Sequence, residues 1–306
     1  MTVATGDLRA ALEANLSRRI CDLRRTPSPY TSTCRLEDVQ VVLHDGTRLQ
    51  LVFKDLSSPG IKPLFVWEPL REIRTYQHIL ANLPDTATCY ASGETWLLLE
   101  KVPGVELYQV GDIRVWQAVA RWLAELHLWG ESLRISDEAH LIQHTRAFYQ
   151  HWMQRALAHA PHSAQFTSLA QQHRQVVEHL LVLPRTFLHG ECYASNVIVD
   201  AGATLRVCPV DWEMAGYGPG LMDLAALTAG SWTSAQRDMI VRSYRDVIGP
   251  SLSEVDFKRA LDACRFQMAV QWLGWSAGWR PPREHANNWL DEALAAAARL
   301  GLSCAG

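Results

Sequence analysis

The chain has 306 residues, of which 48% are hydrophobic, and its formal net charge is −3 at pH 7. A chain of this size and composition can bury a large core, as one two-lobed unit or as two ordinary domains, which argues against disorder. No long run of one charge sign occurs, so a nucleic acid or an anionic membrane surface is disfavoured as the main partner.

The cysteines and the N-terminus indicate the compartment. Seven cysteines are widely spaced, without a Cys-x-x-Cys pair, which argues against a disulfide framework and against a structural zinc site. Residues 1–25 lack the apolar segment of a signal peptide, and no stretch approaches the roughly 20 apolar residues that span a bilayer. We therefore expect a soluble cytoplasmic protein.

The N-terminal third reads as a β-rich segment with one helix. Residues 39–43 and 48–56 are predicted strands joined at Asp45-Gly46, a strong hairpin signal, and the second strand carries Lys54. Apolar residues at helical spacing predict a helix over 66–83, closed by Pro84. That helix carries Glu68 and Glu72.

Two further strands are predicted at 87–91 and 96–101, before the hinge-like sequence Val102-Pro103-Gly104. The remainder is mostly helical, with one small predicted hairpin. Helices are expected over 115–129, 141–160, 166–183, 256–279 and 287–300, and the hairpin over 197–199 and 205–210. This pattern divides the chain into residues 1–101 and 102–306.

The most informative motif is Leu-His-Gly-Glu-Cys-Tyr-Ala-Ser-Asn at residues 188–196. It contains Glu191 and, five positions later, Asn196; fifteen residues on, Asp211-Trp212-Glu213 follows an apolar strand. Magnesium-dependent phosphoryl transfer needs one group that holds the acceptor hydroxyl and two that hold the metal. The spacing therefore indicates this chemistry.

A strand lysine, a helix acid, the His-Gly-acid loop and the Asp-Trp-Glu strand end occur in one order, followed by Asp223-Leu224-Ala225. In this the chain resembles the aminoglycoside phosphotransferase and choline-kinase-like family. The resemblance implies an α+β, protein-kinase-like fold. Its smaller N-terminal lobe would have an antiparallel sheet and one helix, binding nucleotide, and its larger, mainly helical lobe would bind the acceptor.

The resemblance also implies roles for individual residues. Lys54 would contact the phosphates of ATP with Glu72 as its helix partner, although Glu68 lies one turn away and could serve instead. Asn196 and Asp211 match the Mg²⁺ ligands of the family. The adenine would lie against the linker backbone from Glu100 to Val102. His189 and Asp223 would brace the loop.

Two features depart from the family pattern. Glu191 stands where the family usually has aspartate, which adds one methylene to the group that orients the acceptor. The region expected to cover the phosphates, residues 25–38, contains no glycine and offers hydroxyls such as Ser32 instead. These departures keep open a pseudokinase that binds a partner or nucleotide without turnover.

We expect the acceptor to be the hydroxyl of a small molecule, such as a sugar or natural product, or of a peptide Ser or Thr. Acids and bases balance over residues 251–306, so the acidic cleft expected for a polycationic aminoglycoside is not indicated. Trp272, Trp275 and Trp279 share one predicted helix face, with Trp289 nearby. They read either as core residues or as an aromatic wall of the acceptor site.

Overall fold

The computed structural model describes residues 3–29, 34–60, 62–133, 140–159, 163–202, 204–250, 252–275 and 287–302. It consists of two compact units. Unit 1 comprises Met1–Glu106, Ile135–His140 and Val197–Met214, and unit 2 comprises Leu107–Arg134, Leu141–Asn196 and Ala215–Gly306. The predicted α+β class is confirmed.

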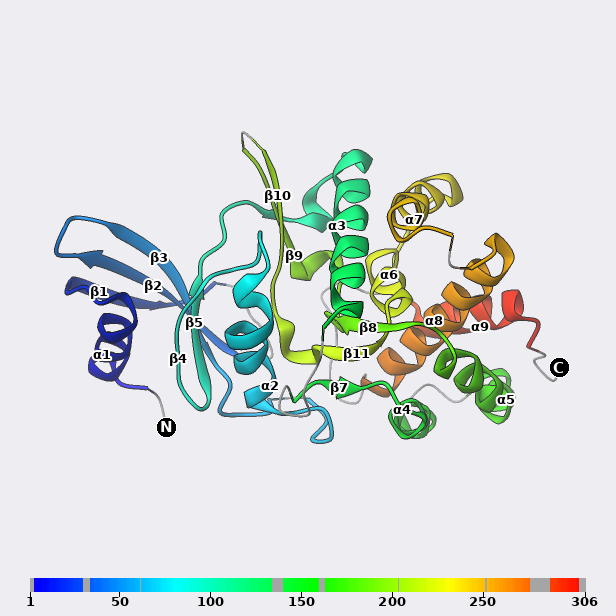
Figure 1. Cartoon of the computed structure of the whole chain (residues 1–306). Coiled ribbons are helices and arrows are strands. Elements are labelled where there is room, and N and C mark those ends of the chain that lie inside the picture. The colour runs from blue at the N-terminus through cyan, green and yellow to red at the C-terminus, as the bar shows by residue number, and fades with distance from the viewer. Residues whose placement is uncertain are drawn as a thin grey trace. The chain divides into compact units, whose positions relative to one another are not determined.

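Unit 1 contains a five-stranded antiparallel sheet in the order β1-β2-β3-β5-β4 (Figure 1). The strands are β1 (Ile20–Pro27), β2 (Arg35–Leu43), β3 (Arg48–Asp55), β4 (Cys89–Ser92) and β5 (Trp96–Glu100). The predicted β2–β3 hairpin is confirmed. Its turn needs a residue with positive φ, and Gly46, at +84°, supplies it.

The core of this sheet depends on helix α1 and strand β1, which the sequence did not predict. Helix α1 (Thr5–Leu16) places Leu8 and Leu12, one turn apart, against the sheet, where both are fully buried. They pack with alternate residues of the strands, among them Val39, Val41 and Phe53. This face of the sheet is therefore covered by the start of the chain.

The helix predicted over 66–83 is shorter and less regular than expected. Helix α2 spans only Pro69–Arg74, since proline favours the first helical position and the Glu68 carboxylate caps the Leu70 N–H at 3.1 Å. A π-helical turn, η1 (Thr75–Ile79), and a 3₁₀ turn, η2 (Leu80–Asn82), follow. Glu72 thus lies in the only α-helical part of the segment.

A second, smaller sheet of unit 1 has the order β10-β9-β6. Its strands are β6 (Val105–Glu106), β9 (Val197–Ala201) and β10 (Leu205–Pro209), followed by the 3₁₀ turn η6 (Trp212–Met214). The predicted β9–β10 hairpin is confirmed. Because β9 pairs with β6, residues 197–214 belong to unit 1, whereas the sequence-based division placed them in 102–306.

Unit 2 is mainly helical and contains a three-stranded sheet in the order β7-β11-β8 (Figure 1). Its strands are β7 (Ile142–Gln143), β8 (Arg185–Leu188) and β11 (Gly216–Pro219). Its α-helices are α3 (Ile113–Glu131), α4 (Arg146–His159), α5 (Ala164–Leu181), α6 (Leu221–Leu227), α7 (Ser234–Ile248), α8 (Glu254–Trp275) and α9 (Trp289–Leu300), and its 3₁₀ turns are η3 (Leu107–Gln109) and η5 (Ala194–Asn196).

The sequence predicted α3, α5 and α9 closely but did not anticipate α6 and α7. The helix expected over 141–160 begins later because β7 takes its first residues, and the end of the helix expected over 256–279 lies outside the described residues. In the part of the chain that the structure describes, no helix has the length and apolar character needed to cross a membrane.

Strand β8, which leads into the 188–196 motif, is held against α3. The Thr186 hydroxyl donates to the backbone oxygen of His127 at 2.6 Å. A Cβ on Gly130 would lie 2.4 Å from Thr186 Oγ1, so only glycine allows this approach of helix and strand. Packing of α3 on β8 therefore fixes where the motif begins.

Candidate active site

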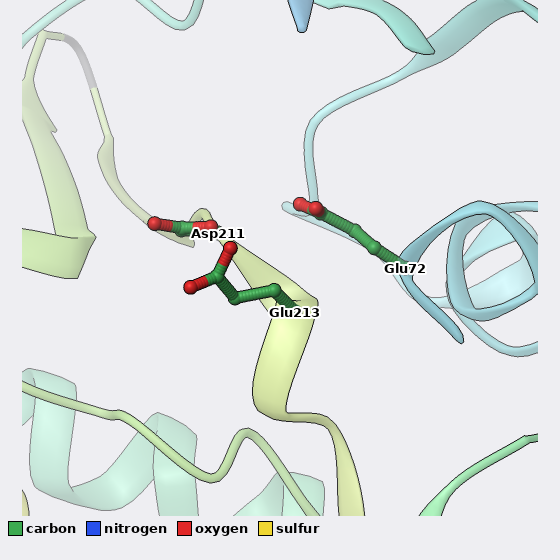
Figure 2. A group of neighbouring side chains, drawn as sticks. All are labelled: Glu72, Asp211 and Glu213. Atoms are coloured by element: carbon green, nitrogen blue, oxygen red, sulfur yellow. The ribbon is translucent and has the colours of Figure 1, made fainter. Parts of the chain in front are cut away.

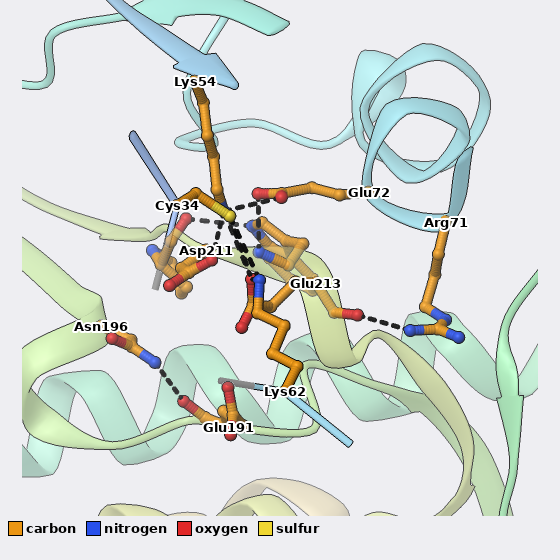
Figure 3. Close-up of polar contacts among 11 residues, drawn as sticks. Cys34, Lys54, Lys62, Arg71, Glu72, Glu191, Asn196, Asp211 and Glu213 are labelled. Carbon is orange, nitrogen blue, oxygen red and sulfur yellow. Dashed lines mark hydrogen bonds and ion pairs between the residues drawn. The ribbon is translucent and has the colours of Figure 1, made fainter. Parts of the chain in front are cut away.

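A buried lysine lies at the centre of the candidate site in unit 1. Lys54, on β3, has a side chain only 6% exposed, and its ammonium forms ion pairs with Glu72, at 2.6 Å, and with Asp211 (Figure 3). Glu72, and not Glu68, is therefore the helix carboxylate that pairs with Lys54, as expected. The contact joins a strand, a helix and the end of the β9–β10 hairpin.

The carboxylates keep this lysine charged. Burial alone would lower the pKa of Lys54, but the charges of Asp211 and Glu72 outweigh it and raise the pKa well above its usual value. Glu72 is held in turn, because its Oε1 accepts a hydrogen bond of 3.2 Å from the Trp212 backbone N–H. A fixed, permanently protonated ammonium is suited to binding a polyanion.

Asp211 has an unusual backbone conformation. Its φ is +66°, in the left-handed region that non-glycine residues seldom adopt, although aspartate tolerates it better than most. The next residue, Trp212, is fully buried and donates its indole N–H to the Pro209 oxygen at 3.1 Å, which anchors the turn. Backbone strain of this kind is often found at functional sites, where the surrounding structure holds it.

One group of carboxylates among the described residues lies close enough to share a metal ion. Oxygens of Glu72, Asp211 and Glu213 lie within 4.8 Å of one another (Figure 2). Hard carboxylate oxygens are the donors that Mg²⁺ prefers, so the donor chemistry fits this ion. Burial and the charge of Asp211 raise the pKa of Glu213 to about 7, against the opposing charges of Lys54 and Lys62.

In unit 2, the motif loop after β8 is braced by Asp223 at the start of α6. The Asp223 carboxylate accepts the backbone N–H groups of His189 at 2.7 Å and Gly190 at 2.9 Å, and it also contacts His127 Nε2 at 3.2 Å. Burial disfavours its charge, yet the hydrogen bonds from His127 and the loop leave its pKa below the usual value. The expected bracing role of Asp223 is confirmed.

Within the loop, His189 and Asn196 stabilise its path. The His189 Nδ1 accepts the Glu191 backbone N–H at 3.2 Å, which confirms its expected bracing role. The side-chain amide of Asn196 donates to the Glu191 backbone oxygen at 3.0 Å (Figure 3). Since the NH₂ group makes this bond, Asn196 Oδ1 is the atom left to act as a metal ligand.

The aromatic residues of unit 2 divide into two groups. Trp275 is buried and stacks on Trp152, with ring centroids 5.7 Å apart, so it belongs to the core. Trp272 is half-buried, stacks on Trp289 at 5.3 Å with nearly parallel rings, and donates its indole N–H to the Tyr193 hydroxyl. Tyr193 lies two residues after Glu191, so this aromatic stack joins the motif loop. Trp279 lies outside the described residues.

The other residues predicted to contact the nucleotide are Ser32, Glu100 and Val102. Ser32 lies outside the described residues. The Glu100 carboxylate is engaged by Arg206, at 2.6 and 3.0 Å, and by the Thr88 backbone N–H at 3.1 Å. Val102 follows β5 without regular secondary structure. The backbone N–H groups of Glu100 and Lys101 donate to the oxygens of Thr88, at 2.8 Å, and Gln50, at 2.9 Å. The contact of this linker with the adenine stays a prediction.

Sequence reasoning missed several residues around Lys54. Glu213 belongs to the Asp-Trp-Glu motif but was given no role, and Lys62 and Cys34 carried no signal in the sequence. Lys62 forms an ion pair with Glu213 and donates to Cys34 Sγ at 3.1 Å. The other cysteine of interest, Cys192, is fully buried, which together with the charge of Asp223 raises its thiol pKa well above the usual value. It is therefore no thiolate nucleophile.

Comparison with solved structures finds many of the same fold. A candidate fructosamine-3-kinase from Thermobifida fusca is 15% identical, with a TM-score of 0.63 over 98% of this chain and 100% of its own. An ethanolamine kinase from Plasmodium vivax is 14% identical, with 0.61 over 92% and 82%. A macrolide 2′-phosphotransferase from Brachybacterium faecium is 17% identical, with 0.56 over 97% and 98%.

These structures share the two-lobed, protein-kinase-like fold that the sequence predicts. No curated protein matches the sequence. The model of the phosphotransferase enzyme family, APH, matches residues 43–266, which include Lys54, Glu72, the motif loop and Asp211. The chain therefore belongs to the APH phosphotransferase enzyme family.

Proposed function

We propose that the protein is an ATP-dependent kinase that transfers the γ-phosphoryl group to a hydroxyl of a small molecule. The observation that carries the proposal is the buried Lys54 ammonium, held by Glu72 and Asp211. Burying the charges of Lys54 and Glu72 is costly unless they are paired, and an ammonium fixed in this way suits the phosphates of a nucleotide. Membership of the phosphotransferase family supports the same reaction.

The nucleotide-binding residues have separate tasks. Lys54 binds phosphate oxygens, and Glu72 keeps its ammonium in place. Asn196, through Oδ1, and Asp211 would hold Mg²⁺, which when bound would offset the charge that develops on the phosphate oxygens. The backbone from Glu100 to Val102 contacts the adenine, and the hydroxyl of Ser32 contributes to the phosphate site.

Glu191 orients the acceptor and removes its proton. The acceptor oxygen forms a bond to the γ-phosphorus while the bond to the bridging oxygen breaks, so that ADP leaves and the proton passes to the carboxylate. The ordinary pKa values of glutamate and aspartate, about 4.3 and 3.9, make either residue a competent base. The additional methylene changes the reach of the carboxylate and not its chemistry.

The aromatic stack supports an acceptor with an apolar or ring-shaped face. Tyr193, Trp272 and Trp289 present aromatic surface beside the motif loop, and such surfaces suit sugars and aromatic natural products. The balanced charge of residues 251–306 gives no support to a polycationic acceptor. A Ser or Thr hydroxyl of a peptide is the alternative acceptor, for which no contact in the described residues argues.

Nucleotide binding and transfer can be tested separately. ATP with Mg²⁺ is expected to raise the melting temperature of the wild type and of Asp246→Asn, an exposed control on α7, but not of Asp211→Asn. Unchanged melting of all three would favour a pseudokinase without nucleotide. Incubation of a metabolite pool with protein and ATP, read by mass spectrometry, should reveal an acceptor 80 Da heavier, the mass of one added phosphoryl group.

The role of Glu191 has its own test. Transfer should be lost in Glu191→Ala and retained in Glu191→Asp, since aspartate keeps the carboxylate that accepts the proton. If Glu191→Ala transfers phosphate as fast as the wild type, this carboxylate is not the base. If ATP binds but no pool yields a phosphorylated product, the pseudokinase is the better description.

A further inference from the structure

A second buried lysine lies beside the first. Lys62, in the segment between β3 and α2, has a side chain only 5% exposed (Figure 3). Its ammonium pairs with the Glu213 carboxylate and donates to Cys34 Sγ at 3.1 Å. Burying an ammonium is unfavourable unless it is paired, so these contacts account for its position.

Glu213 lies within reach of both lysines. Its Oε2 is 3.9 Å from Lys54 Nζ, at the limit of an ion pair, whereas Lys62 contacts the same oxygen closely. Glu72 and Asp211 already occupy Lys54. The observed arrangement therefore gives each lysine its own carboxylates, and Lys62 takes Glu213.

A small cavity lies beside Glu213. A cavity of about 20 Å³, the space of roughly one water molecule, is bordered by Lys62, Glu72 and Glu213. Because Glu213 Oε2 is already 3.9 Å from Lys54 Nζ, a small movement of this carboxylate would pair it with Lys54 once the Lys62 ammonium is lost. The balance of three carboxylates against two ammonium groups would also become three against one.

We propose that Lys62 is a positioning residue that holds Glu213 away from Lys54, so that Lys54 remains available to the phosphates of a nucleotide. This inference rests on the proposed function, because it assigns phosphate binding to Lys54. Lys62 keeps Lys54 available by fixing the Glu213 carboxylate and by offsetting its charge. It need not contact the nucleotide.

The proposal predicts opposite effects on two ligands. At a pH well above 7, where Glu213 is ionised, loss of Lys62 leaves one more uncompensated negative charge, which repels a triphosphate and attracts a bare cation. In Lys62→Met the affinity for ATP with Mg²⁺, measured by calorimetry, should fall on the order of tenfold. The affinity for Mn²⁺ alone, measured by electron paramagnetic resonance, should rise by about threefold or more. A general loss of structure would weaken both.

Two further variants separate positioning from folding. Lys62→Met combined with Glu213→Gln removes the competing carboxylate, so ATP affinity should return to within about threefold of the wild type. Lys62→Arg keeps the cation and should bind ATP nearly normally. Lys258→Met is the matched control, since this lysine forms an exposed pair with Glu254 on α8. Circular dichroism of each variant reports whether it is folded.

The outcomes are distinct. Unchanged ATP affinity in folded Lys62→Met would overturn the proposal, as would a double variant that stays as weak as the single one, because Lys62 would then act on the nucleotide directly. If the wild type and Lys258→Met bind no ATP, the proposed function fails. The Mn²⁺ measurement still decides whether Lys62 offsets the charge of Glu213.

Discussion

Replacing Asp223 with asparagine should destabilise the protein strongly, although the two side chains have nearly the same shape. The carboxylate is 1% exposed and accepts two backbone N–H groups of the motif loop and the His127 ring nitrogen. Asparagine keeps one acceptor oxygen, and its NH₂ group then faces buried donors. Hydrogen bonds to a buried charge contribute about 1.5 to 3 kcal/mol each, so the loss should be about 3 to 5 kcal/mol.

Urea denaturation followed by tryptophan fluorescence measures this loss, with Asp246→Asn on the exposed face of α7 as the control. The pKa of Asp223 is lowered in the folded state, so its stabilisation is present above the unfolded value of about 3.9 and disappears as pH falls through the folded pKa. The difference between wild type and variant should therefore shrink below about pH 4. A loss under 1 kcal/mol at pH 7, or one that persists unchanged at pH 3, would refute the bracing argument.

Two further predictions concern the packing at a glycine and a partly buried ion pair. Gly218→Ala should lower the stability of the protein by roughly 1 to 3 kcal/mol, because the new Cβ would lie 2.6 Å from the His144 Cβ. Gly202→Ala is the control: its nearest atom lies at 3.7 Å, so stability should change by under about 0.5 kcal/mol. Equal urea midpoints for the two variants would contradict this. Arg206→Met should lower the stability of the protein by only about 1 kcal/mol, since its paired hydrogen bonds to Glu100 are partly solvated; a loss beyond about 3 kcal/mol in the same assay would show that the pair is worth more.

The elements that the sequence predicted correctly are those whose signals are local. The β2–β3 hairpin follows from alternation and Asp45-Gly46, and the β9–β10 hairpin from two short β-rich runs. The pairing of Lys54 with Glu72 is not a local signal; it was implied by the resemblance to the phosphotransferase family. Helix α2 was predicted too long because Pro69 and the cap at Glu68 set its start and a π-turn replaces its second half.

The parts that the sequence did not predict depend on contacts between distant residues. Nothing near Lys62 in the sequence indicates a buried ion pair, because its partner lies 151 positions away in Glu213. Tyr193 likewise contacts Trp272, which donates its indole N–H to the tyrosine hydroxyl from a distant part of the chain. Such pairs are invisible to periodicity and spacing, which report on neighbours along the chain.

The composition of unit 1 has a consequence for biosynthesis. Lys54 and Glu72 are translated early, but Asp211 and strand β9, which pairs with β6, come from residues 197–214. A ribosome must therefore add more than a hundred residues after β5 before this unit has all its parts. Until then a nascent chain carries a cationic strand without its final counter-ion, and closing so long a loop makes its completion a late step of folding.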